Sequence, residues 1–171
     1  MKLANVFASF AVLASVSYAQ FTASYETAYD NPQRSLSTVA CSDGANGLLT
    51  RNFTTLGSLP SYPNVGGVPA VTGWNSPDCG TCWTVTYTNA QGIAKSINLL
   101  AIDSASNFNM ASAAMNSLTD DQATSLGRVP VTAISAPQSS CGLPRFVGSN
   151  SWQHLTDIHF TLVHEEHFIR T

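Results

Sequence analysis

Charged side chains are scarce in this chain. Lys, Arg, Asp and Glu make up 10% of its 171 residues, and the net charge at pH 7 is −3. No cluster of basic residues is present, which excludes an electrostatic surface for nucleic acid and a polybasic membrane anchor. A surface of uncharged polar side chains suits a neutral partner better than an ionic one, and a neutral polysaccharide is the first candidate.

Histidine is absent from residues 20–143, where the sequence predicts its folded domain. This absence excludes a Ser-His-Asp or Cys-His nucleophile from that span and leaves no credible metal site there. We therefore expect no catalytic residue, no metal ion and no cofactor. Any activity would be carried by carboxylates or by binding alone.

Long apolar segments are also lacking, apart from one at the N-terminus. Residues 3–16 follow a positively charged start, are too short to cross a bilayer, and lead into Ser17-Tyr18-Ala19, a small-x-small cleavage pattern. We interpret residues 1–19 as a signal peptide, with a buried N-terminal helix as the alternative. The mature chain is then secreted and extracellular, has no membrane span, and meets an oxidising environment. Residues 20–143 suit one domain, and we expect a monomer.

Only four cysteines are present, at Cys41, Cys79, Cys82 and Cys141. The CGTC pair leads into WTVTYT (residues 83–88), whose alternation predicts a strand. A redox dithiol would need its first sulfur at the start of a helix, and a zinc site would prefer a second close pair. We therefore predict two structural disulfides.

Loop closure favours particular pairings among these cysteines. A Cys79–Cys82 bridge would close a very short loop, whereas bridges from Cys41 and Cys141 to the central pair close long loops and restrict the unfolded chain more. We favour Cys41–Cys79 with Cys82–Cys141. The spacing alone leaves the crossed pairing open.

Alternation of side chains predicts strands at both ends of the domain. FTASYETAY (residues 21–29) has a period of two, and residues 96–103 form a nearly continuous apolar run that is typical of a buried strand. Residues 128–136 form another strand, in which Pro130 indicates an edge or a bulge. Short strands, long loops and two disulfides favour a small closed barrel.

One or two short helices are expected between the last two of these strands. Asn109 fits an N-cap for residues 110–118. Thr119 fits a capping box that opens residues 120–126, which Gly127 would end. The predicted fold class is therefore mainly β with one or two short helices.

Five blocks of the sequence resemble one family in their order and spacing. They are CSDGANGLLTR (residues 41–51), GGVPAVTGWNSPDCGTCW (66–83), LLAIDSASNFNM (99–110), AMNSLTDDQATSLGRV (114–129) and CGL (141–143). Together they resemble the cerato-platanin family of small secreted fungal proteins, over roughly residues 21–143 of the chain.

This resemblance implies more than the residues themselves do. It implies a small double-psi β-barrel related to the expansin N-terminal domain, with Cys41–Cys79 and Cys82–Cys141 as its disulfides. It implies binding of chitin or N-acetylglucosamine oligomers, and expansin-like loosening of cellulose without hydrolysis. It also implies an extracellular or fungal cell-wall location, and recognition by a plant receptor as an elicitor of defence.

Asp103 is the first candidate for contact with a sugar. Expansin-like barrels and the related endoglucanases carry an aspartate at the end of a strand in the sugar groove, and Asp103 matches that place at the end of LLAID. It would hydrogen-bond sugar hydroxyls, or in a hydrolase protonate the leaving oxygen. The alternative is a turn cap for residues 104–107.

A second carboxylate would be needed for a weak inverting glycosidase, about 6.5–9.5 Å from the acid. Asp30 and Asp43 are the contenders, although each is also explained as a turn residue. Asp120 and Asp121 are better explained by the helix start on which they are expected. We therefore favour a non-catalytic protein and keep the hydrolase as an alternative.

A neutral sugar site needs amides, hydroxyls and an aromatic face. We predict that Trp83 and Phe108 pack in the core and do not form such a face. The predicted carbohydrate-binding residues are Asp103, Asn107, Asn109, Tyr25, Tyr29, Asp30, Asp43, Trp74 and Asn75. A second hypothesis is an effector that a host receptor recognises, with sugar binding incidental.

Asn52 begins the sequon Asn52-Phe53-Thr54 and is a candidate N-glycosylation site on a surface loop.

Residues 144–171 form an atypical C-terminal extension that holds all four histidines of the chain. We favour an artefact of the gene model, such as a translated intron or a frameshift. The alternative is a zinc-binding or membrane-touching appendage built on His159, His164 and His167.

Overall fold

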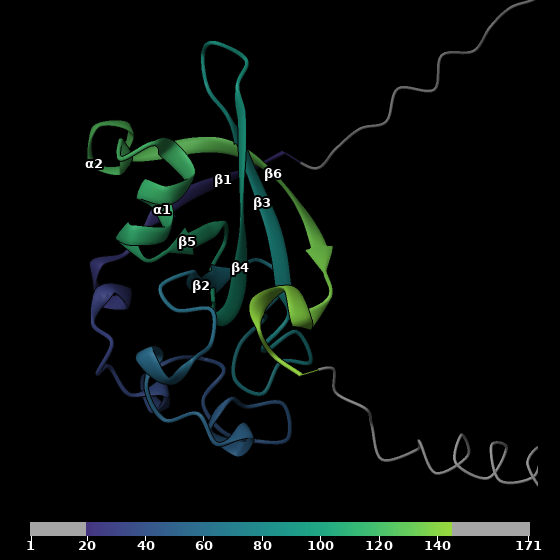
Figure 1. Ribbon diagram of the computed structural model, residues 1–171. Coiled ribbons are helices and arrows are strands. Elements are labelled where there is room, and N and C mark those ends of the chain that lie inside the picture. The colour runs from purple at the N-terminus through teal and green to yellow at the C-terminus, as the bar shows by residue number, and fades with distance from the viewer. Residues whose placement is uncertain (1–19, 145–171) are drawn as a thin grey trace, which may run out of the picture.

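Six strands close into a barrel in the computed structural model, which describes residues 20–144 (Figure 1). They are β1 (Gln20–Tyr25), β2 (Val65–Val68), β3 (Cys82–Thr88), β4 (Ala94–Ser104), β5 (Phe108–Met110) and β6 (Arg128–Ala136). Their order around the barrel is β1-β5-β2-β4-β3-β6. The small double-psi β-barrel that the sequence predicted is therefore confirmed. The predicted signal peptide and residues 145–171 lie outside the described residues.

Two of the strand pairs are parallel, and these pairs position the candidate site. β1 runs parallel to β5, and β2 runs parallel to β4, while the other neighbours are antiparallel. A parallel pair needs a long crossover, so each of these contacts joins segments that are far apart in the sequence. The residues that face solvent along β1, β5 and β4 thus come from distant parts of the chain.

The barrel core is filled by alternate side chains of the strands. Val85 on β3 is buried, whereas Thr84 and Thr86 beside it are partly exposed. On β5, Phe108 and Met110 are buried, and Asn109 between them is partly exposed. On β4 the four consecutive residues Leu99, Leu100, Ala101 and Ile102 are all buried. Loops cover the outer face there, since the amide N–H groups of Gly80 and Cys41 donate to the carbonyls of Ala101 and Ile102. The prediction of a strand buried on both faces is confirmed for this half of β4.

Helical segments are short and lie at the ends of the barrel. The α-helices are α1 (Ser112–Thr119) and α2 (Ala123–Leu126), and the 3-10 helices are η1 (Thr27–Asp30), η2 (Leu36–Thr38), η3 (Leu49–Arg51), η4 (Leu56–Ser58) and η5 (Gln138–Cys141). Within residues 20–144, no helix has both the length and the apolar character needed to cross a membrane. In Figure 1 the loops between β1 and β2 gather at one end of the barrel, and the β3–β4 hairpin projects from the other.

The strand predicted over residues 21–29 is shorter than expected. β1 ends at Tyr25, because the Glu26 carboxylate accepts a hydrogen bond from the Ala28 amide and caps η1. Tyr29 and Asp30 therefore lie on a 3-10 turn and not on a strand. This turn carries the Tyr29 side chain inward, where it is 5% exposed.

The predicted helix caps are also wrong. Asn109 lies in β5, and α1 begins only at Ser112. Thr119 belongs to the last turn of α1, where its hydroxyl donates to the Met115 carbonyl. Asp120 follows it in the left-handed conformation, with φ of 53°, and ends α1, so it does not open the next helix. Gly127 ends α2 as predicted.

The predicted strand of residues 128–136 coincides with β6, and Pro130 lies where the strand has an edge. Pro130 is opposite Thr22 of β1, but the pairing between β3 and β6 stops at Thr132. A proline, which has no N–H to donate, is therefore tolerated.

The two disulfides are Cys41–Cys79 and Cys82–Cys141, with Cα atoms 5.3 and 5.8 Å apart. This confirms the pairing that loop closure favoured and excludes the crossed one. All four cysteines are buried. The first bridge holds the loop after η2 against the start of β3, and the second holds the end of the domain against the same strand.

Candidate functional site

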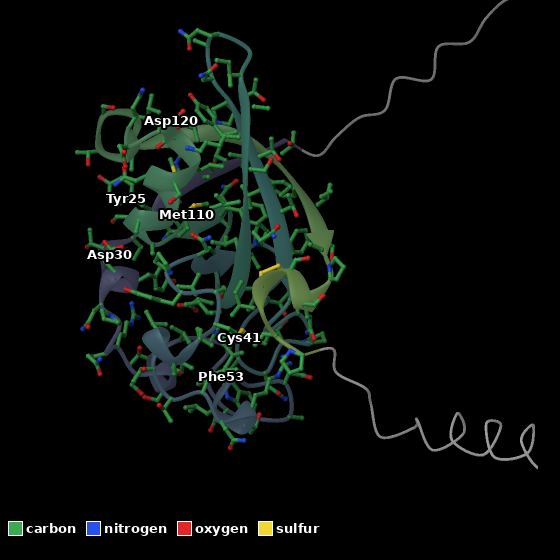
Figure 2. All side chains as sticks on the ribbon, in the orientation of Figure 1. Tyr25, Asp30, Cys41, Phe53, Met110 and Asp120 are labelled. Carbon is green, nitrogen blue, oxygen red and sulfur yellow. A yellow bond between two sulfur atoms is a disulfide. The ribbon has the colours of Figure 1, made fainter. Side chains whose placement is uncertain are left out.

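A pocket of about 320 Å³ opens where β1 and β5 meet the turn between β4 and β5. It is lined by Ser24, Tyr25, Ala105, Ser106, Asn107, Asn109 and Arg128. Three predicted binding residues, Tyr25, Asn107 and Asn109, thus come together here. Figure 2 places Tyr25 on the flank of the barrel where β1 passes into η1.

The parallel pairing of β1 with β5 aligns the polar side chains of this pocket. Ser24 is opposite Asn109 in the register, and Phe108 and Met110 on either side of Asn109 are buried in the core. Asn109 therefore points outward. The Ser24 hydroxyl donates to Asn109 Oδ1 at 3.1 Å.

Asn107 is held in the same way. The Thr22 amide N–H donates to Asn107 Oδ1 at 3.2 Å, which fixes the orientation of the side-chain amide. Neither Asn107 Nδ2 nor Asn109 Nδ2 donates to another residue within the described part of the chain. Both amides therefore present their N–H₂ groups to a ligand.

Gly67 is a buried residue of β2 that lies between Asn109 and Asp103. In the register it is opposite Asn109 on one side and Asp103 on the other. A Cβ atom at Gly67 would lie 2.9 Å from the Cβ of Ala105, which is too close for a real contact. Glycine here lets the turn of residues 104–107 lie against β2, and the outer surface stays shallow.

Asp103 is held by three hydrogen bonds. Its Oδ1 accepts from the amides of Ala40 and Ser104, each at 2.9 Å, and its Oδ2 accepts from the Tyr29 hydroxyl at 3.0 Å. The bond from Ser104 comes from the next residue, which still belongs to β4, so the proposed cap of residues 104–107 stays a prediction. The carboxylate is half-buried, and its remaining lone pairs have a fixed direction.

Tyr29 acts on Asp103 as a permanent donor. Burial, together with the neighbouring Asp103 carboxylate, raises the pKa of the Tyr29 phenol well above its usual value. The Arg34 guanidinium lies 5.2 Å from the centre of the Tyr29 ring, and its charge opposes this rise. The phenol therefore stays protonated at neutral pH and keeps donating to Asp103.

Asp43, Trp74 and Asn75 form a second cluster on two loops. The Trp74 indole N–H donates to Asp43 Oδ1 at 2.6 Å, while the ring system is 66% exposed. Asn75 Oδ1 accepts from the Asn46 amide at 2.9 Å. The indole N–H, followed by the Ser42 hydroxyl, lowers the pKa of the Asp43 carboxyl. None of these residues lines the pocket.

Asp30 stabilises the start of α1 and does not line the pocket. Its Oδ1 accepts from the Ser112 amide at 2.7 Å and its Oδ2 from the Ser112 hydroxyl at 2.6 Å, so it caps the N-terminus of α1. The Tyr62 hydroxyl donates to its backbone carbonyl at 2.5 Å. Both carboxylate oxygens are therefore engaged, which disfavours Asp30 as the base of a glycosidase.

Two other features of the sequence are placed as follows. Asn52 is exposed at the end of η3, with φ of 66°, and a glycan there stays a prediction. Among residues 20–144, no group of three or more His, Cys, Asp or Glu side chains is arranged to hold a metal ion.

The sequence interpretation missed four pocket residues, which are Ser24, Ala105, Ser106 and Arg128. Ser24 and Ser106 adjoin predicted residues in the sequence, so their neighbours pointed to them. Arg128 begins β6 and reaches the pocket only because it is opposite Ser24 in the antiparallel pairing of β1 with β6. That contact depends on the barrel register, which no local pattern shows.

Comparison with known proteins gives one consistent result. The family model described as cerato-platanin matches residues 21–143. The chain is 51% identical to the allergen Asp f 15 homolog of Arthroderma benhamiae over 119 residues, which is 70% of this chain and 57% of that protein. It thus spans little more than half the length of this relative.

Solved structures agree with this match. Cerato-platanin 2 from M. perniciosa is 45% identical and has a TM-score of 0.69, and the match covers 73% of this chain and 100% of that one. The fungal elicitor cerato-platanin, solved in solution, is 38% identical and has a TM-score of 0.61, over 70% of this chain and 95% of that one.

Proposed function

Because the chain belongs to the cerato-platanin family, we propose that it is a secreted, non-catalytic carbohydrate-binding protein. Its ligand is chitin or an oligomer of N-acetylglucosamine, and cellulose is a second possible substrate. It acts outside the cell, in the medium or on the fungal cell wall, as a monomer without a cofactor.

The observation that carries this proposal is the set of polar side chains on β1, on β5 and at the end of β4. Asn109 and Asp103 are the register partners of Gly67 on either side, so an amide donor and a carboxylate acceptor lie on the two strands that flank β2. A sugar bound across these strands would meet a donor at Asn109 and an acceptor at Asp103. The acetamido carbonyl of N-acetylglucosamine accepts from an amide N–H₂ such as that of Asn107.

The proposed action on cellulose or chitin follows from the same side chains. A polysaccharide chain in a crystal is held by hydrogen bonds to its neighbours. Fixed donors and acceptors on the protein replace some of these bonds at little entropic cost, because Asp103 and Asn109 are already held in place. The chain is then loosened without cleavage of a glycosidic bond.

Hydrolysis is not proposed because the second carboxylate is missing. Asp30 caps α1, and Asp43 is bonded to Trp74 in the other cluster. The similar proteins are named as an allergen homolog and a fungal elicitor.

A second candidate function is recognition by a plant host. A protein with a TM-score of 0.61 to this chain is described as a fungal elicitor. The exposed Trp74 ring, fixed by its bond to Asp43, supports this candidate, since such aromatic residues often anchor protein interfaces. An Asp103→Asn protein that loses sugar binding but keeps elicitor activity would separate the two functions.

The proposal is tested by sedimentation with chitin powder. Asn109→Ala removes a donor from the pocket, and Asn98→Ala is the matched control, because Asn98 is also half-exposed but bonds to Thr84 away from the pocket. We expect the Asn109 variant alone to bind less, with no release of reducing ends. Equal binding of both variants would contradict the proposed site.

A further inference from the structure

Arg128 is the one charged residue among those that line the pocket. Its Nη1 donates to the Thr22 hydroxyl at 2.8 Å. In the part of the chain that the structure describes, the ion pair found is Lys95–Asp120, so no carboxylate neutralises Arg128. Its Nε and Nη2 make no further bond to the described residues.

The amides beside Arg128 add donors and not acceptors. Asn107 Oδ1 accepts from Thr22, and Asn109 Oδ1 accepts from Ser24, so both oxygens are used within the protein. The N–H₂ group of each amide remains available. The pocket therefore offers two amide N–H₂ groups and a guanidinium as donors, beside the hydroxyls of Ser24, Tyr25 and Ser106, which can also accept.

A group that only accepts hydrogen bonds matches this arrangement. Sugar hydroxyls donate as readily as they accept, and an acetamido group also carries an N–H. A carboxylate has about four acceptor sites and no donor, and it pairs with a guanidinium through charge-assisted hydrogen bonds. The donors and the positive charge both favour a carboxylate.

Glu26 and Asp103 are close in the sequence to residues that line the pocket, but neither of them lines it. Glu26 follows Tyr25, but its Oε1 is turned to the Ala28 amide of η1. Asp103 does not line the pocket, and in the register it is separated from Asn109 by Gly67.

We propose that this pocket selects a sugar that carries a carboxylate, a uronic acid, with Arg128 as its ionic partner. The inference rests on the proposed function, because it names the class of sugar that one end of the same site takes. A chain of uronic acids, or a mixed chain with a uronic acid at this position, would then bind more tightly than a neutral one. Arg128 is exposed, so the preference for the acid weakens as salt is added.

The test compares a trimer of galacturonic acid with its methyl ester, which is the same sugar without the charge. Both are titrated into the full secreted chain and into Arg128→Gln, followed by amide chemical shifts. Lys95→Gln is the control, because it makes the same change in net charge on the β3–β4 hairpin, where Lys95 pairs with Asp120. A trimer of N-acetylglucosamine is titrated in parallel.

We expect the acid to bind at least about tenfold more tightly than the ester, because a hydrogen bond to a charged group strengthens binding by about this factor. Arg128→Gln should abolish this difference, and Lys95→Gln should keep it. Binding of the N-acetylglucosamine trimer should change less than twofold in Arg128→Gln. Equal affinity for acid and ester, or a preference that survives in Arg128→Gln, would overturn the inference.

The failure of the proposed function has a different signature. Absence of binding to the N-acetylglucosamine trimer, with the acid still preferred over the ester, contradicts the chitin proposal and supports Arg128 as the selective residue. Absence of binding to the acid overturns the inference whether or not the neutral trimer binds.

Discussion

The hydroxyl of Tyr29 donates to Oδ2 of Asp103 at 3.0 Å and joins two residues that are 74 positions apart. The bond exists because η1 interrupts the strand after Tyr25 and turns Tyr29 inward. It links the first segment of the barrel to the end of β4, where the candidate sugar contact lies. The position of the Asp103 carboxylate thus depends on a side chain from a distant part of the sequence.

Removal of this hydroxyl should weaken both folding and binding. We expect Tyr29→Phe to lower the free energy of unfolding by about 1 kcal/mol and to weaken N-acetylglucosamine binding several-fold, because Oδ2 of Asp103 loses its donor. Tyr87→Phe is the control, since the Tyr87 hydroxyl makes no hydrogen bond to the described residues. Urea denaturation measures the free energy of unfolding, and titration calorimetry measures the affinity for N-acetylglucosamine oligomers. Equal values of both quantities in Tyr29→Phe and Tyr87→Phe would contradict the role of Tyr29.

The raised pKa of Tyr29 also sets the sign of a pH effect. The contribution of Tyr29 to stability is fully present below its unfolded pKa of 10.0 and is lost as the pH rises toward the higher folded value. When the pH is raised above 10, the free energy of unfolding should therefore fall less in Tyr29→Phe than in the unchanged protein.

Asp30 should contribute to stability and not to binding. Asp30→Ala removes the cap of α1, and we expect the free energy of unfolding to fall by about 1–2 kcal/mol while the affinity for sugar stays within twofold. Asp78→Ala, in a loop, is the control for loss of a carboxylate. A large loss of affinity in Asp30→Ala, without loss of stability, would restore Asp30 to the binding site.

The bond between Trp74 and Asp43 should titrate at low pH. The folded pKa of Asp43 lies below 3.8, so the bond is present above that pH and is lost as the pH falls through the lower folded value. The indole N–H resonance of Trp74, followed from pH 5 to pH 2, should shift with a midpoint below 3.8. It should not titrate in Asp43→Asn, and a midpoint at or above 3.8 would contradict the hydrogen bond.

Gly67 should be needed for the shape of the site. Gly67→Ala places a Cβ atom 2.9 Å from that of Ala105, so the turn of residues 104–107 must move away from β2. We expect a protein that still folds but binds N-acetylglucosamine several-fold more weakly. The double variant Gly67→Ala/Ala105→Gly removes the clash and should recover most of the affinity. No recovery would show that the glycine acts in another way.

Local patterns predicted most of the barrel. The alternation of residues 83–88 gave β3, the nine residues of β6 were predicted as observed, and loop closure favoured the disulfides that form. Each of these depends on side chains close in the sequence or on chain entropy. The first strand was predicted too long, because its alternation continues through Tyr29 while the Glu26 cap begins a 3-10 turn.

The candidate site was predicted only in part, since its assembly depends on distant pairing. Residue types pointed to Tyr25, Asn107 and Asn109, which the barrel brings together. They could not separate these from Trp74, whose cluster is distinct, or from Asp30, which caps a helix. Arg128 was missed because its neighbour across the sheet is Ser24, 104 positions earlier, as the register of β1 with β6 requires.

The central claim is that the pocket and Asp103 form a binding site for N-acetylglucosamine oligomers that cleaves no bond. The most direct test is an NMR titration of the protein with such an oligomer, in which amide shifts and new reducing-end signals are followed together. The account predicts shifts that cluster on Tyr25, Asp103, Asn107 and Asn109, without new reducing ends. Shifts elsewhere, no shifts at all, or the appearance of reducing ends would contradict it.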